Sequence, residues 1–161
     1  MQGRHYLLMI AMAALSQALS PQAAAAPPAA KSTAPVADAL RQMTQRYSRI
    51  LVAGAGAMPA EKYNYRPTPA QMSFSQIQVH LANEGNDILC GKTAGLEVPQ
   101  RTKMDTTATK EQLIARLKET FQFWEQAFAK MDDSKLSEPV QMFGIPNLTR
   151  ASAVLITIGD W

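Results

Sequence analysis

The sequence predicts an all-α protein that folds as a four-helix bundle. Apolar residues repeat at steps of three and four in several segments, which is the period of a helix packed on a core. Capping signals precede two of these segments. Alternation of apolar and polar residues, the signature of a half-buried strand, is not found. A chain of 161 residues suffices for one domain with its own core.

Residues 1–26 differ in composition and predict a secretory signal peptide. Arg4 follows the amino terminus, a short apolar run comes next, and the alanines at 23–26 offer a cleavage site. The apolar run is short for a bilayer span, and a retained membrane anchor is the competing interpretation. We expect a periplasmic or secreted protein without stable membrane insertion after cleavage. Residues 27–35 are expected to form a disordered linker before the domain at 36–161.

Charge and cysteine content exclude two classes of protein. The net charge is +3, and loss of residues 1–26 removes Arg4 and no acid, which leaves +2. So small an excess, without a basic cluster, does not predict a nucleic-acid partner. A single cysteine rules out an internal disulfide framework.

The first predicted helix covers residues 36–58. Its apolar positions, which follow a helical period, are Val36, Leu40, Met43, Tyr47, Ile50 and Leu51. Gly54 and Gly56 weaken its end, and Pro59 follows.

The second predicted helix covers residues 73–90 and has the clearest start in the chain. Ser73 can serve as the N-cap, with Gln76 completing a capping box. Pro67 and Pro69 keep the chain upstream extended. Its apolar stripe is Phe74, Ile77, Leu81 and Ile88.

His80 lies at the edge of that stripe and is the only histidine outside the first five residues. On a continuous helix, Asn83, Glu84 and Asp87 share a flank with it. A histidine with polar neighbours at a core border suits a metal ligand. It also suits an ordinary helix boundary.

The third and fourth helices are predicted at 109–131 and from Thr149 onward. The third has a capping box at Thr109 and Gln112 and a stripe of Leu113, Leu117, Phe121, Trp124, Phe128 and Met131. The stripe is interpreted as core.

The fourth predicted helix is roughly 20 Å long, against roughly 35 Å for the third. Residues 91–108 form the long connection before the third helix, which indicates a crossover or a functional loop.

The remaining candidates for chemistry have ordinary structural interpretations. Cys90, with Lys92 as its only basic neighbour, is read as a small buried hydrophobe. Tyr63 and Tyr65 are expected to pack their loop over the bundle, and Arg150 to be solvated. With one histidine left after cleavage, a Ser/His/Asp set is excluded, and the chain has no phosphate-binding glycine loop.

Two segments resemble the DinB-like superfamily of metalloenzymes: AMPAEKYNYRPTPAQMSFSQIQVHLANEGNDILC at 57–90 and FGIPNLTRASAVLITIGDW at 143–161. The resemblance covers the chain from about Val36 onward. It implies a four-helix bundle of up-down-down-up order, with a long crossover between helices two and three. It also implies a divalent metal, zinc or nickel, held by a histidine on helix two and an HxxxH pair on the last helix.

His80 matches the first of these ligands, and Asp160 falls in the register of the first histidine of the pair. The position of the second lies beyond Trp161, so we expect the sequence to be cut short within the last helix. Three ligands with one open position are typical of catalytic zinc. We therefore expect weak metal binding by the chain as it stands, through His80 with Asp160, or with Glu84 one turn on. The alternative for Asp160 is a solvated carboxylate at the end of the helix.

Two functions follow from this resemblance. The first is an exported metal-dependent protein, in the manner of family members that are thiol-dependent transferases, with a small-molecule substrate that the sequence does not identify. The alternative is a non-enzymatic binding or interaction module that has lost the metal. Whether the protein is an enzyme is left open by the sequence, which also allows a homodimer.

The predicted signal peptide is tested by the mature amino terminus. Mass spectrometry of the protein from its native host should show a new terminus between Ala23 and Ala30. Intact Met1 on membrane-bound protein would instead support the anchor.

Overall fold

The computed structural model describes residues 31–142 and 144–159, without the side chains of Glu84 and Gly85. The predicted signal peptide and Asp160 therefore lie outside the described residues. The helices are α1 (Pro35–Ala57), α2 (Phe74–Leu81), α3 (Glu84–Ala94), α4 (Lys110–Ala129) and α5 (Arg150–Gly159), with 3-10 turns at Ala60–Lys62 and Asp133–Lys135. The described part of the chain contains only an isolated bridge between Pro139 and Thr149 in place of a sheet.

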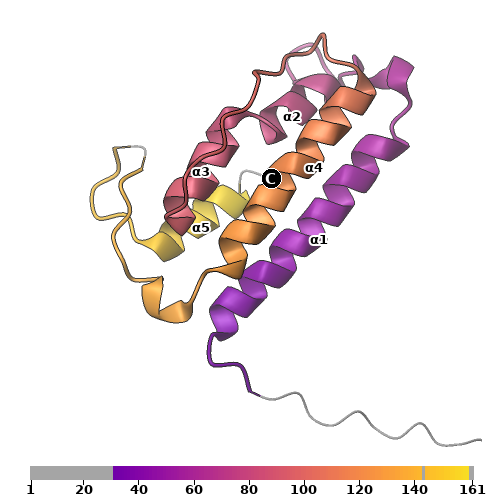
Figure 1. The fold of residues 1–161 in the computed structure, drawn as a ribbon. Coiled ribbons are helices and arrows are strands. Elements are labelled where there is room, and N and C mark those ends of the chain that lie inside the picture. Colours follow the sequence, from indigo (N-terminus) through magenta and orange to yellow (C-terminus); the bar gives the residue numbers. More distant parts are fainter. Residues whose placement is uncertain (1–30, 143, 160–161) are drawn as a thin grey trace, which may run out of the picture. The chain divides into compact units, whose positions relative to one another are not determined.

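The order of the helices confirms the predicted all-α bundle. In Figure 1, α1 runs upward, α2 and α3 together run downward, α4 runs downward beside α1, and α5 turns back upward. The crossover from Gly95 to Thr109 returns the chain from the end of α3 to the start of α4 (Figure 1). This is the up-down-down-up order, with α2 and α3 sharing the second place.

Both predicted capping boxes are present. Ser73 Oγ accepts from the Gln76 backbone N–H at 3.3 Å, and Gln76 Oε1 accepts from the Ser73 N–H at 2.7 Å. Thr109 and Gln112 make the same pair of bonds at 3.3 and 2.8 Å. These side chains satisfy backbone donors that a helix start leaves unpaired, which explains why α2 and α4 begin where the sequence predicts.

The start of α1 and the end of α4 cap each other. Asp133 accepts from the backbone N–H groups of Ala37 at 2.7 Å and Val36 at 3.1 Å. Arg41 Nη1, from α1, donates to the carbonyl oxygens of Met131 at 2.9 Å and Phe128 at 3.3 Å. A carboxylate at a helix start and a cation at a helix end are both favoured by the helix dipole. The reciprocal arrangement fixes the register of α1 against α4.

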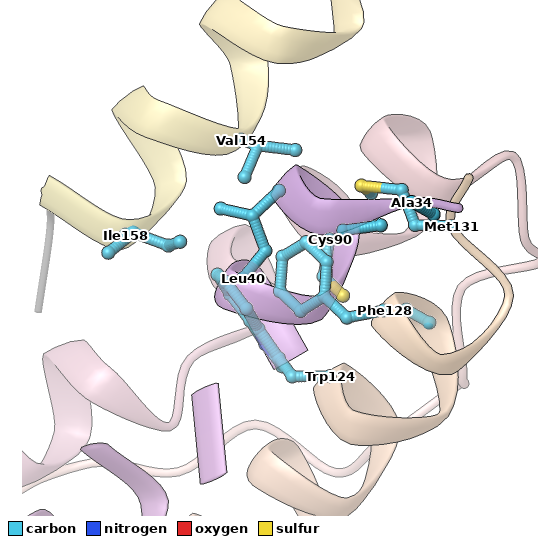
Figure 2. Close-up of a cluster of buried hydrophobic side chains, with 10 residues drawn as sticks. Ala34, Leu40, Cys90, Trp124, Phe128, Met131, Val154 and Ile158 are labelled. Carbon is cyan, nitrogen blue, oxygen red and sulfur yellow. The ribbon is translucent and has the colours of Figure 1, made fainter. Parts of the chain in front are cut away.

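The predicted stripe of α4 forms the centre of the bundle. Its buried members are Leu113, Leu117, Phe121, Trp124, Phe128 and Met131. Trp124 is fully buried, and its ring centroid lies 5.9 Å from that of Phe128. Figure 2 shows both rings in one cluster with Leu40 of α1 and Val154 of α5. The interpretation of the stripe as core is confirmed.

The stripe predicted for α1 is only partly buried. Val36, Met43 and Ile50 are 49, 38 and 52% exposed. The buried residues of α1 are Ala37, Leu40, Thr44 and Ala55. Large side chains dominated the sequence pattern, whereas small residues form much of the packed face. Small residues permit close approach of neighbouring helices, which accounts for the difference.

The second predicted helix is two helices, so the prediction of one continuous helix at 73–90 is wrong. Helix α2 ends at Leu81, Asn83 is extended with φ −80° and ψ 164°, and α3 begins directly after it. Helix α3 also continues beyond Cys90 and ends at Gly95, whose φ of +70° suits glycine. The crossover is correspondingly shorter than predicted.

Replacement of Trp124 tests the central position of α4. Trp124→Ala should lower the free energy of unfolding by about 3–5 kcal/mol, because it leaves a cavity in the core. Gln126→Ala, at an exposed position of the same helix, should stay within about 0.5 kcal/mol. Denaturant unfolding of the two variants measures both values. Equal stabilities would place Trp124 outside the core.

Candidate functional site

His80 lies half-buried in the last turn of α2, where the helix ends. Its carbonyl oxygen accepts from Asn83 Nδ2 at 2.5 Å and from Asn86 Nδ2 at 3.1 Å. The Asn86 amide also donates to the Leu81 carbonyl at 3.0 Å. These bonds satisfy carbonyl groups that the end of a helix leaves without an intrahelical partner. The backbone that carries the His80 side chain is therefore held firmly.

The same two asparagines start the next helix. Asn83 Oδ1 accepts from the Asn86 backbone N–H at 3.0 Å, which makes Asn83 the N-cap of α3. Asn86 is 2% exposed, so its side-chain amide makes its hydrogen bonds to the His80 and Leu81 carbonyls in the protein interior. The helical period predicts Asn83 on one flank of a continuous helix with His80. It instead forms the junction, because its side chain competes with the backbone for hydrogen bonds.

Asp87 is also separated from His80 by the junction. It is fully buried, and its Oδ2 atom accepts from Arg101 Nε of the crossover at 2.6 Å. Burial raises the pKa of the Asp87 carboxyl, while the Arg101 guanidinium acts in the opposite direction. The predicted sharing of a flank by His80 and Asp87 is therefore wrong. Asp87 anchors the crossover.

Asp87 belongs to a network of ion pairs that the sequence pattern did not reveal. Arg101 also contacts Glu119 Oε2 of α4 at 3.1 Å, and Arg116 Nε contacts the same oxygen at 3.2 Å. Arg116 Nη1 donates to the Thr102 carbonyl at 2.8 Å. The i,i+3 spacing of Arg116 and Glu119 was a usable signal. The part played by Arg101 depends on the path of the crossover, which the sequence does not reveal.

Cys90 lies in the core rather than in a reactive site. It is fully buried and packs in the cluster of Leu40, Trp124 and Val154 (Figure 2). Burial, and secondarily the negative charge of Asp87, raise the pKa of the Cys90 thiol. The thiolate is the reactive form of cysteine. This environment supports the interpretation of Cys90 as a small hydrophobe.

The predictions for the two tyrosines and Arg150 are partly correct. Tyr63 is buried, donates to the Ala55 carbonyl at 2.7 Å and packs edge-to-face on Phe74, so it covers the bundle as predicted. Tyr65 is 58% exposed, which makes its predicted packing wrong. Arg150 is not a solvated arginine.

Arg150 joins α5 to two other segments. It donates to the Thr93 carbonyl near the end of α3 and to Glu138 Oε2 at 2.8 Å. Its side chain is 14% exposed.

The described residues supply one candidate metal ligand. The imidazole of His80 suits zinc or nickel, while Asp160 and the side chain of Glu84 lie outside what the structure describes. Within the described ranges, three or more His, Cys, Asp or Glu side chains do not gather as a metal site. These residues fit the first ligand of the expected site and leave the others unassigned, so we derive no reaction step through a metal.

Comparison with protein families addresses the fold and its origin. The model of the DinB superfamily matches residues 39–159, which includes all of α2, α3, α4 and α5 and most of α1. The chain belongs to the DinB superfamily. The predicted DinB-like fold is thereby confirmed. A search of curated proteins found no match to this DinB chain. In the residues that the structure covers, every helix is too short or too polar to cross a bilayer.

The junction after His80 is tested by removing the buried amide. Asn86→Ala leaves the Leu81 carbonyl without its side-chain donor and should cost about 2 kcal/mol of unfolding free energy. The matched variant Asn83→Ser keeps an N-cap side chain at a half-buried position and should cost less than about 1 kcal/mol. Denaturant unfolding compares them. A smaller loss in Asn86→Ala than in Asn83→Ser would contradict the central part assigned to Asn86.

Proposed function

We propose that this DinB protein binds a divalent metal ion, zinc or nickel, with His80 as a ligand. The observation that carries the proposal is the position of His80. Its side chain is half-buried at the end of α2, and its backbone is held by Asn83 and Asn86. A ligand on a fixed backbone loses little freedom when it binds. The chain has one other histidine, His5, which belongs to the predicted signal peptide.

Asp160, which follows the last residue of α5 in the sequence, is proposed as a second ligand. A carboxylate oxygen and an imidazole nitrogen are both ordinary zinc ligands. Two protein ligands hold a metal less firmly than three or four, so we propose a weak site with open positions for water or substrate. A metal bound there would supply the acidification of a coordinated water or thiol.

We extend the proposal to an exported protein of thiol-dependent transfer chemistry, by analogy with the family. The thiol would come from a small molecule. Cys90 is unsuited because it is fully buried and its pKa is raised. The composition of residues 1–26 supports export. His80 would hold the metal, and the Asn86 amide would position His80 through the hydrogen bond to the His80 carbonyl.

A second candidate function is a protein-interaction module without a metal. The observation in its favour is a set of large apolar side chains that are 38–66% exposed on three helices: Met43 and Ile50 of α1, Ile77 of α2, and Leu155 and Ile156 of α5. Exposed apolar surface of this kind is characteristic of interaction sites when it is contiguous. A second copy of the chain is one such partner.

Metal titration separates the two candidates. Isothermal titration calorimetry of the chain with zinc and with nickel should give saturable binding, weakened at least about tenfold in His80→Ala, the loss of one ligand. Asp105→Asn, an exposed carboxylate of the crossover, is the control and should bind as the unchanged chain does. If neither metal binds the unchanged chain, or if His80→Ala binds equally well, the metal proposal fails and the interaction module replaces it.

A further inference from the structure

A cavity beside the α2–α3 junction has the features of a small-molecule site distinct from His80. Its volume is about 290 Å³, near the lower end of the range for ligand pockets. One wall comes from Val79, Ala82 and Asn83 at the junction. The other lining residues are 101–104 of the crossover and Arg116 of α4. Four segments of the chain therefore meet at this cavity.

Two arginines of the cavity are held in place before any ligand arrives. Arg101 is tied to Asp87 and Glu119, and Arg116 is tied to Glu119 and the Thr102 carbonyl. Their side chains are only 14 and 13% exposed. A guanidinium fixed in this way loses little conformational entropy on binding an anion. Both arginines line the cavity directly.

Arg116 has donor capacity to spare. Its Nε and Nη1 atoms are engaged by Glu119 and Thr102, while Nη2 makes no hydrogen bond to any residue that the structure describes. A guanidinium has five N–H donors, which suit a carboxylate or phosphate oxygen. Lys103 adds an exposed ammonium to the same lining.

The charge balance around the cavity favours an anion. Three cationic side chains, Arg101, Lys103 and Arg116, line it, against the two carboxylates of Asp87 and Glu119 that pair with the arginines. Asp105 lies near Lys103 but is not part of the lining, and its carboxylate accepts from the Thr107 N–H at 2.8 Å. One positive charge remains in excess.

The apolar wall restricts the kind of anion. Val79, Ala82 and Met104 contribute hydrocarbon side chains to the same lining as Arg116. Inorganic phosphate would leave this wall in contact with water. An apolar body would cover it and gain from the burial of surface.

We propose that this cavity binds a small organic monocarboxylate, with its carboxylate on Arg116 and Lys103 and its apolar body on Val79, Ala82 and Met104. The residues assigned to the carboxylate and its apolar body are separate from the proposed metal ligands, His80 and Asp160. The two sites share one neighbour, Asn83, which lines the cavity and whose amide holds the His80 carbonyl. Occupancy of the cavity does not require a metal.

Benzoate is the probe that tests this proposal. Calorimetry with the full chain in EDTA should give saturable binding with Kd on the order of 0.1–1 mM, as expected for so small a ligand. Benzamide, which keeps the shape and lacks the charge, should bind at least about tenfold more weakly. Phosphate should also bind more weakly, because it cannot use the apolar wall.

Two variants test the charge and the shape of the site separately. Arg116→Gln should weaken benzoate binding about tenfold by removing the charged donor. Val79→Phe keeps every charge and should abolish binding by filling the cavity, which preserves the test if Arg116→Gln fails to fold. Lys118→Gln is the matched control, since it removes a cation of α4 that lines a different groove, between α1 and α4. It should bind benzoate unchanged.

The proposal is overturned by any of three results. The first is the absence of saturable benzoate binding to the unchanged chain. The second is equal binding of benzoate by folded Val79→Phe or Arg116→Gln and by Lys118→Gln. The third is binding of phosphate or benzamide as tight as that of benzoate, which would show that the carboxylate and the apolar wall do not act together.

Discussion

The arrangement of the second half of this bundle depends on one buried side chain, the amide of Asn86. It supplies donors to the His80 and Leu81 carbonyls at a point where the helical ladder stops. Without such donors, buried carbonyl groups would carry the cost of desolvation. With them, the chain can end α2 inside the protein and start α3 in a new direction. The new direction brings α3 against α4 and α5.

The long crossover required by the up-down-down-up order is held by charge. Asp87 is fully buried, and a buried carboxylate is tolerated only with a close partner. Arg101 is that partner, and Glu119 and Arg116 extend the pairing to α4. The crossover is therefore held to α3 through Asp87 and to α4 through Glu119. The hydrogen bonds of Asp133 to the start of α1 and of Arg41 to the carbonyl groups at the end of α4 likewise hold these two helices together.

Membership of the DinB superfamily describes a scaffold, and the scaffold separates three environments. Cys90 lies in the apolar core, where its thiol is protected. His80 lies at the border of the bundle, on a backbone that two asparagines hold. The cavity beside the junction lies next to the arginines of the crossover. Function belongs to such sites rather than to the fold, so each environment is tested by its own residues.

The sequence alone determined the helices whose signals are local. The capping boxes at Ser73 and Thr109 and the stripe of α4 depend on residues three and four apart, which periodicity detects. It also singled out His80 as the one histidine of the domain. The resemblance carried by residues 57–90 and 143–161 led to the correct family.

Only the tertiary structure decided which polar residues meet. The sequence around Asn83 fits a continuous helix, because asparagine is compatible with a helix. The helix break depends on the cap that Asn83 forms with the Asn86 N–H and on the burial of Asn86, and neither can be read from the sequence. The pairing of Asp87 with Arg101 depends on the path of a crossover without periodicity. The buried face of α1 likewise followed small residues such as Ala37, since close packing favours them over the larger side chains that dominate a sequence pattern. The spacing of residues along the chain determines local interactions, whereas contacts across the bundle depend on how the helices pack.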